Sequence, residues 1–196
     1  MNNDYEISKE FIGNKRNEYS SNDEACMLTA FAWASRSKDP STQVGACFVN
    51  ENNKIISVGY NGAPNGWDDD SFPWRRPEKG EGEYNSKYPY VIHAEMNGVL
   101  NYDGPGKDFR GSTCFVTLFP CAQCAKFLVQ RGIKRVVYYT DDRKDTEDNK
   151  CAKRTFTMTG VEFIDFHDLM TRRTKDIEIN LDEEKGPIKI KRKEDK

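Results

Sequence analysis

Residues 114–139, CFVTLFPCAQCAKFLVQRGIKRVVYY, contain the clearest indication of the fold. Two short apolar runs, at 114–118 and 135–139, are rich in β-branched and aromatic residues, which is typical of buried strands. Residues 122–131 between them predict a helix. Buried strands that alternate with helices along the chain are typical of a largely parallel sheet covered by helices.

The alternation continues on both sides of this stretch. A helix and a last strand follow it, and a helix and an opening hairpin precede it. The ranges are 147–159 for a helix that ends at Gly160, 161–166 for the last strand, 91–100 for the preceding helix, and 44–49 with 55–58 for the hairpin. Residues 59–88 form a long stretch without periodicity, and loops of that length in compact domains are usually functional.

A further helix is predicted ahead of the hairpin. Residues 21–24, SNDE, match the S-x-x-E capping box. Apolar residues follow at helical spacing from Met27 to Ala34. The helix should stop before Asp39, because the proline that follows disfavours the helical conformation in its predecessor.

Together these elements predict an α/β fold, a three-layer α/β/α sandwich with a five-stranded mixed sheet. One domain should span residues 21–170. We expect residues 1–20 to be a flexible lead-in and residues 171–196, acidic first and then basic, to be a solvated charged tail. A partner-binding arm is the alternative for the tail.

Composition and charge favour a small substrate. The 196 residues carry a formal net charge of −2, whereas proteins that bind nucleic-acid backbones usually have a basic excess. No apolar run is long enough to span a membrane, and no secretory signal precedes the domain. The sequence therefore predicts a cytoplasmic protein whose six cysteines are not used for disulfides.

Three residues predict a metal site. His93 lies in His-Ala-Glu, and Cys121 and Cys124 lie in Pro-Cys-Ala-Gln-Cys. Cysteines at i and i+3 in the first turn of a helix share one face, and the exposed amides there favour thiolates. Two thiolates and an imidazole select zinc over hard cations such as magnesium. A redox pair or half of a structural zinc site is the alternative for an isolated C-x-x-C.

The number of ligands indicates catalysis. A structural zinc normally has four protein ligands, and only three cluster here, which would leave the fourth position to water. Bound zinc lowers the pKa of such a water, and Glu95 could take its proton. Because residues i and i+2 of a regular helix point to different sides, His93 and Glu95 must sit at the entrance of a helix. We interpret Cys47 and Cys114 as small buried apolar residues of strands, and His167 as a core histidine with satisfied hydrogen bonds.

His-x-Glu followed by Pro-Cys-x-x-Cys is typical of zinc-dependent nucleobase deaminases. The wider sequence resembles the deoxycytidylate deaminases, especially those of animals. The segments that carry the resemblance are RSKDP (36–40), QVGAC (43–47), GYNGAPNG (59–66), PWRR (73–76), KYPY (87–90), HAE (93–95) and LFPC (118–121). The resemblance covers roughly residues 24–166.

The resemblance implies hydrolytic deamination of dCMP to dUMP, which supplies thymidylate synthesis. His93, Cys121 and Cys124 would hold Zn²⁺, with Glu95 as the catalytic proton carrier. Asn61 would bind the sugar or base. Members of the family are commonly homohexamers that are activated by dCTP with Mg²⁺ and inhibited by dTTP.

Other residues are expected to bind phosphate or the base. The loop at 59–66 would form part of the regulatory site, because glycines let backbone amides approach a phosphate; a plain surface turn is the alternative. Arg36 would act at the substrate phosphate, and Phe119 would line the base pocket or lie in the core. The residues expected to bind effector or phosphate are Gly59, Asn61, Gly62, Asn65, Gly66, Arg75 and Arg76.

Arg143 departs from the family. Many relatives have an aromatic residue in the loop at 141–144, and here that position is an arginine. The resemblance therefore leaves open whether control by effectors is retained.

The sequence leaves two kinds of rival function. Another zinc deaminase could act on cytidine, dCTP or an adenosine in tRNA, although the nearly neutral charge disfavours tRNA. The second rival is a zinc-binding module without catalytic activity. Glu95 disfavours this alternative, because a structural zinc site does not require a carboxylate beside its ligands.

Overall fold

The computed structural model describes residues 19–171, 177–180 and 189–192 of the chain. Its five-stranded sheet has the order β2-β1-β3-β4-β5. β1 is antiparallel to β2 and β3, while β3, β4 and β5 run parallel. The predicted mixed sheet is confirmed. The elements are α2 (Asn22–Ala34), β1 (Gly45–Val49), β2 (Ile55–Tyr60), η1 (Glu83–Asn85), α3 (Ala94–Leu100), η2 (Gly106–Phe109), β3 (Thr113–Leu118), α4 (Ala122–Arg131), β4 (Arg135–Thr140), α5 (Glu147–Thr159), β5 (Glu162–Asp165), α6 (Phe166–Thr171), β6 (Ile177–Asn180) and β7 (Lys189–Arg192).

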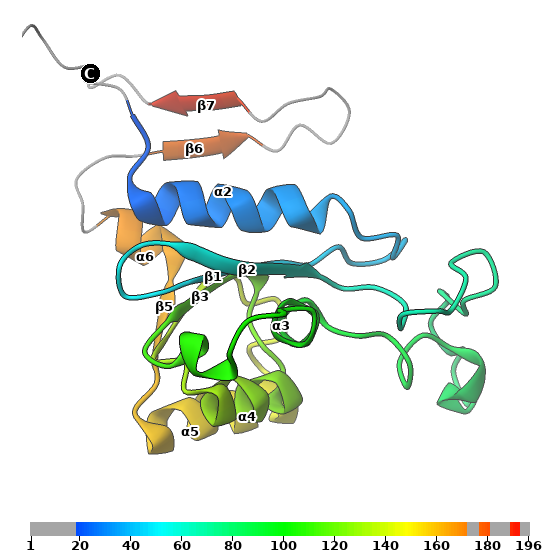
Figure 1. Cartoon of the computed structure of the whole chain (residues 1–196). Coiled ribbons are helices and arrows are strands. Elements are labelled where there is room, and N and C mark those ends of the chain that lie inside the picture. Colours follow the sequence, from blue (N-terminus) through cyan, green and yellow to red (C-terminus); the bar gives the residue numbers. More distant parts are fainter. Residues whose placement is uncertain (1–18, 172–176, 181–188, 193–196) are drawn as a thin grey trace, which may run out of the picture.

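Helices cover both faces of the sheet. Figure 1 shows α2 on one side and α3, α4 and α5 on the other. Side chains alternate accordingly: Phe48 and Val116 pack in the core beneath α3, α4 and α5, whereas Cys47 and Phe115 pack with α2 and α6. The predicted three-layer α/β/α sandwich is therefore confirmed.

The capping box of α2 forms as predicted. The backbone N–H of Glu24 donates to the Ser21 side chain, and the N–H of Ser21 donates to the Glu24 carboxylate. The helix ends at Ala34, before Asp39 as expected. The Ser37 hydroxyl then donates to the backbone carbonyl of Asn61 at 2.8 Å, which ties the segment after α2 to the end of β2.

The start of α3 was predicted wrongly. The sequence predicted a helix from residue 91, but α3 begins at Ala94. Ile92 instead exchanges two backbone hydrogen bonds with Gly62, of 2.9 and 3.0 Å, which hold it in an extended bridge. Only after this bridge, at the extended residue His93, can the chain turn into the helix.

Gly59 lets α3 approach the sheet closely. A Cβ atom at this position would lie 2.3 Å from the carbonyl oxygen of Ala94 and 2.4 Å from the backbone nitrogen of Gly98. No side chain fits in that space, because real Cβ contacts are longer. β2 therefore supports the helix that follows His93.

The ends of the chain are described only in part. Residues 1–18 of the predicted lead-in lie outside the described residues, as do residues 172–176, 181–188 and 193–196. The short helix α6 and the strands β6 and β7, which pair antiparallel within the charged tail, were not predicted. Among the described residues, no helix has the length and apolar character that crossing a membrane requires.

Candidate active site

His93, Cys121 and Cys124 meet where α3 and α4 begin. The Nδ1 atom of His93 lies 3.4 Å from the Sγ atom of Cys121 and 3.5 Å from that of Cys124. His93 is the N-cap of α3, and Cys121 is the N-cap of α4. The structure thus brings the three predicted ligands together at two helix entrances, the position that the His-x-Glu spacing required.

The start of α4 stabilises thiolate. The Sγ atom of Cys121 accepts the backbone N–H of Cys124 at 3.4 Å. A hydrogen bond from the Cys124 thiol lowers the pKa of Cys121 to about 3, and the imidazole of His93 acts in the same direction. Because thiolate is the form that binds metals, the residue is prepared to act as a ligand.

The donor set fits zinc. The three ligand atoms all lie within 4.8 Å of one another. Two sulfurs and one imidazole nitrogen match the ligands that Zn²⁺ prefers. Across the described part of the chain, no fourth His, Cys, Asp or Glu belongs to this group. Three protein ligands are the number found in catalytic zinc sites, which keep one position open.

Glu95 lies beside these ligands in the first turn of α3. Its side chain is buried, with an exposed fraction of 3% for the residue. Burial raises the pKa of Glu95, although the neighbouring imidazole of His93 opposes the shift. A buried carboxyl group with a raised pKa can hold a proton and give it up again.

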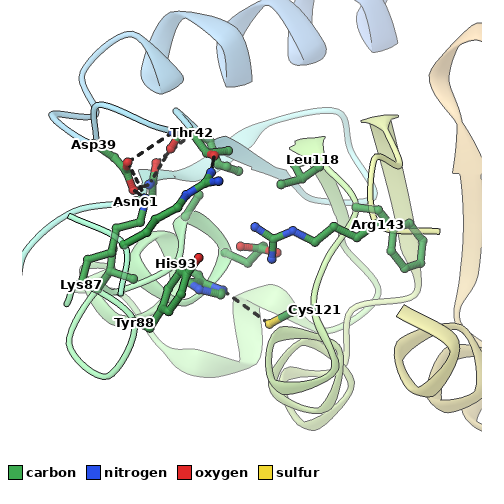
Figure 2. A pocket seen from close by; sticks show the side chains of 15 residues that line it. Asp39, Thr42, Asn61, Lys87, Tyr88, His93, Leu118, Cys121 and Arg143 are labelled. Atoms are coloured by element: carbon green, nitrogen blue, oxygen red, sulfur yellow. Dashed lines mark hydrogen bonds and ion pairs between the residues drawn. The ribbon is translucent and has the colours of Figure 1, made fainter. Parts of the chain in front are cut away.

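A cavity of about 310 Å³ adjoins the group, which is within the size range of small-molecule sites. His93, Glu95 and Cys121 line it, and Figure 2 shows the close approach of His93 and Cys121. Phe119 and Leu118, at the end of β3, add apolar surface. The cavity therefore combines an apolar lining with a few polar groups.

A buried polar cluster forms another wall of the cavity, with Asp39 at its centre. The Nζ atom of Lys87 donates to both carboxylate oxygens of Asp39, and the backbone N–H of Thr42 donates to one of them. Asn61 donates to Asp39 and to the carbonyl of Thr42 through Nδ2, at 3.3 and 3.0 Å. Its Oδ1 accepts the N–H of Val44 at 2.8 Å. Both N–H groups of the Asn61 amide are thus in use, so it can offer a ligand only an acceptor.

The predicted substrate residues lie in different places. Asn61, Phe119 and Arg76 line the cavity. Arg36 does not; its guanidinium lies 5.7 Å from the ring centroid of Tyr60. Arg75 is also outside and forms an ion pair with Glu81.

Part of the predicted effector loop lines a second cavity. Gly62, Asn65 and Gly66 border a space of about 230 Å³ that Trp67 and Trp74 also line. Gly59 does not line it and packs against α3 instead.

The remaining cysteines and histidine lie outside the site. Cys47 and Cys114 are buried within β1 and β3, where we expected structural cysteines. All six cysteines are free. His167 was predicted to be a core histidine, but the residue is exposed because it lies on the outer side of α6. Its imidazole lies 3.1 Å from the carboxylate of Asp165 and contacts the ring of Tyr139.

Sequence reasoning missed several cavity residues. Asp39 and Lys87 stand in segments that carry the family resemblance, but charged side chains are mostly exposed, and nothing local shows that these two pair. Arg143 was noted only as a departure from the family, and the structure places it on the cavity wall. For Asp39 and Lys87, a charge inside a family-like segment was the only available signal.

The chain is similar to known proteins over much of its length. The family model of the cytidine and deoxycytidylate deaminase zinc-binding region matches residues 20–140. The deoxycytidylate deaminases of mouse and human are each 47% identical over 152 residues, covering 78% of this chain and 83% of those proteins.

A solved structure is similar as well. The dCMP deaminase of the cyanophage S-TIM5, in complex with dCMP and dUMP, matches with a TM-score of 0.56 and 28% identity. The match covers 73% of this chain and 95% of the phage protein.

Proposed function

The chain belongs to the cytidine and deoxycytidylate deaminase family, and on this premise we propose that it hydrolyses dCMP to dUMP and ammonia. The observation that carries the proposal is the buried carboxyl group of Glu95 beside the cluster of His93, Cys121 and Cys124, at one end of a cavity of about 310 Å³. We assign the reaction to the domain at residues 21–170, with a lead-in before it and a charged tail after it.

His93, Cys121 and Cys124 would hold Zn²⁺ through one nitrogen and two sulfurs. When bound, zinc supplies a water of lowered pKa as the nucleophile. The low pKa of Cys121 and its position at a helix N-terminus keep the sulfur in the form that binds the metal. Asp148 supports the same end of α4, because its carboxylate accepts the N–H of Ala122 at 3.2 and 3.3 Å.

Glu95 would move the protons. The reaction adds one water to dCMP, forms a C4–O bond and breaks the C4–N bond, so protons must pass from the water to the base. Glu95 would accept one proton from the water and give it to the ring nitrogen N3. It would then accept the second proton from the hydroxyl now bonded to C4 and give it to the amine, so that ammonia leaves and the oxygen stays on C4 as a carbonyl. Its burial supports this role, since a carboxyl group of raised pKa returns a proton readily.

Asn61 and Phe119 would orient the substrate. Because the Asn61 amide already donates both of its N–H groups, its Oδ1 would accept a hydrogen bond from a sugar hydroxyl. Phe119 is held edge-on against Tyr138 at 4.9 Å between ring centroids, and offers an apolar surface to the base. Arg76 would add positive charge for the substrate phosphate, with Arg36 acting from outside the cavity.

Regulation is a second part of the proposal. We place binding of dCTP with Mg²⁺, as activator, and of dTTP, as inhibitor, at the second cavity with Gly62, Asn65 and Gly66. Gly59 and Arg75 would act indirectly, by holding α3 and the 73–81 loop. We further propose a homohexamer, and a reducing compartment such as the cytoplasm, where the thiolate ligands would persist.

Substrate comparison tests the proposal. The zinc-loaded protein is incubated with dCMP, deoxycytidine, cytidine and dCTP at equal concentrations, with and without dTTP. We expect dCMP to have the highest kcat/KM. Faster turnover of deoxycytidine or of dCTP would overturn the assignment to the monophosphate.

A further inference from the structure

Arg143 lies on the wall of the active-site cavity that faces the polar cluster. Figure 2 shows its side chain entering from the side opposite Asp39, Asn61 and Lys87, with the guanidinium directed toward the middle of the cavity. The residue as a whole is exposed, so its stem starts at the mouth of the cavity while its guanidinium reaches inward. A long cation at this place faces whatever part of a ligand points outward.

The loop that carries Arg143 is anchored to α5. The carbonyl of Arg143 accepts two hydrogen bonds from Thr146, from the backbone N–H at 2.9 Å and from the hydroxyl at 2.8 Å. Two residues earlier, the carboxylate of Asp141 accepts hydrogen bonds from Asn149 and Lys153, both at 2.6 Å. The backbone is therefore held on both sides of Arg143, which sets the direction of its side chain.

The other cations of the cavity already have partners. Lys87 is neutralised by Asp39, to which it donates twice. The guanidinium of Arg76 donates to the hydroxyl of Thr42 at 3.3 Å. For Arg143, in contrast, the described residues provide neither a side-chain hydrogen bond nor an ion pair. Its five N–H donors remain available to a ligand.

We infer that Arg143 binds the 5′-phosphate of the substrate and sets the preference for the monophosphate over the nucleoside. This inference rests on the proposed deamination of dCMP. The base must lie beside Glu95 and the metal ligands, which leaves the phosphate to point toward the mouth. A guanidinium pairs with phosphate through two parallel hydrogen bonds, which are stronger than neutral ones.

The test measures kcat/KM of the zinc-loaded wild type and of zinc-loaded Arg143→Ala, with dCMP and with deoxycytidine as substrates. We expect kcat/KM for dCMP to fall by about ten- to a hundredfold, the size of a lost charged hydrogen bond, while that for deoxycytidine is unchanged. Inhibition of Arg143→Ala by the product dUMP should weaken by the same factor as kcat/KM for dCMP. Inhibition by deoxyuridine, which has no phosphate, should not change. Arg143→Lys should restore part of the loss, because it keeps the charge without the paired donors.

Lys144→Ala is the matched control. It removes the same charge from the same loop, but Lys144 does not line the cavity, so both substrates should behave as in the wild type. If Arg143→Ala lowered kcat/KM equally for dCMP and deoxycytidine, the inference would be overturned. It would also be overturned if Arg76→Ala lost the preference for dCMP over deoxycytidine while Arg143→Ala kept it. A wild type that does not prefer dCMP would overturn the proposed function itself. A wild type that prefers it, with Arg143→Ala unchanged, would overturn the inference alone.

Discussion

Lys87 donates hydrogen bonds to both carboxylate oxygens of Asp39, at 2.6 and 2.5 Å, within the wall of the candidate active-site cavity. The two side chains are almost fully buried, with exposed fractions of 5% and 3%. Asp39 in turn accepts a hydrogen bond from the amide of Asn61. A buried ion pair thus holds the residue that we expect to meet the sugar.

Lys87→Met should strongly destabilise the protein. Removing one partner leaves the Asp39 carboxylate buried without its counter-charge, a change that costs about 3–5 kcal/mol. The measurement is the free energy of unfolding from urea titration. Lys38→Met is the control, because the Lys38–Asp69 pair is exposed and should contribute little. Equal urea midpoints for Lys87→Met and the wild type would show that the pair is not buried in solution.

Glu95→Gln should abolish turnover and leave the metal in place. The amide keeps the shape of the side chain but cannot carry the proton, and general acid–base catalysis contributes about 10²–10⁴-fold. The checks are kcat for dCMP and the zinc content per chain. Glu147→Gln, an exposed carboxylate at the start of α5, should match the wild type in both. Activity retained in Glu95→Gln would remove Glu95 from the mechanism.

Cys121→Ser should lose bound zinc. Cys121 is one of the three candidate ligands and the N-cap of α4, and a hydroxyl is a poor substitute for a thiolate. We expect a lower zinc content by elemental analysis and a lower Tm. Cys151→Ser is the matched control, because Cys151 is exposed and lies outside the metal site. Loss of zinc from Cys151→Ser as well would contradict the assignment.

Gly59→Ala should destabilise the protein and lower its activity together. The added methyl would lie 2.3 Å from the carbonyl oxygen of Ala94, so α3 must shift, and overpacking of this kind costs about 1–3 kcal/mol. Gly82→Ala is the control, since a Cβ atom there meets nothing within 4 Å. Urea titration and kcat/KM for dCMP measure both effects. Wild-type stability of Gly59→Ala would contradict the close packing of β2 on α3.

The sequence alone predicted every strand of the main sheet and most helices, because these depend on neighbours along the chain. The capping box at Ser21, the Cys121–Cys124 spacing and the apolar runs are local signals, and each formed as expected. The start of α3 was wrong because Ile92 pairs with Gly62, a contact across 30 residues that periodicity cannot show.

The fold class, and the pattern of three candidate metal ligands with an acid beside them, could be predicted from the sequence, since both follow from residue type and short spacing. Which charges enter the cavity depends on the tertiary structure. Lys87 reaches Asp39, and Arg143 turns inward, because segments far apart in the chain bring partners or open space to them. Whether a charged side chain is buried and paired depends on that distant surrounding, and no local pattern contains it.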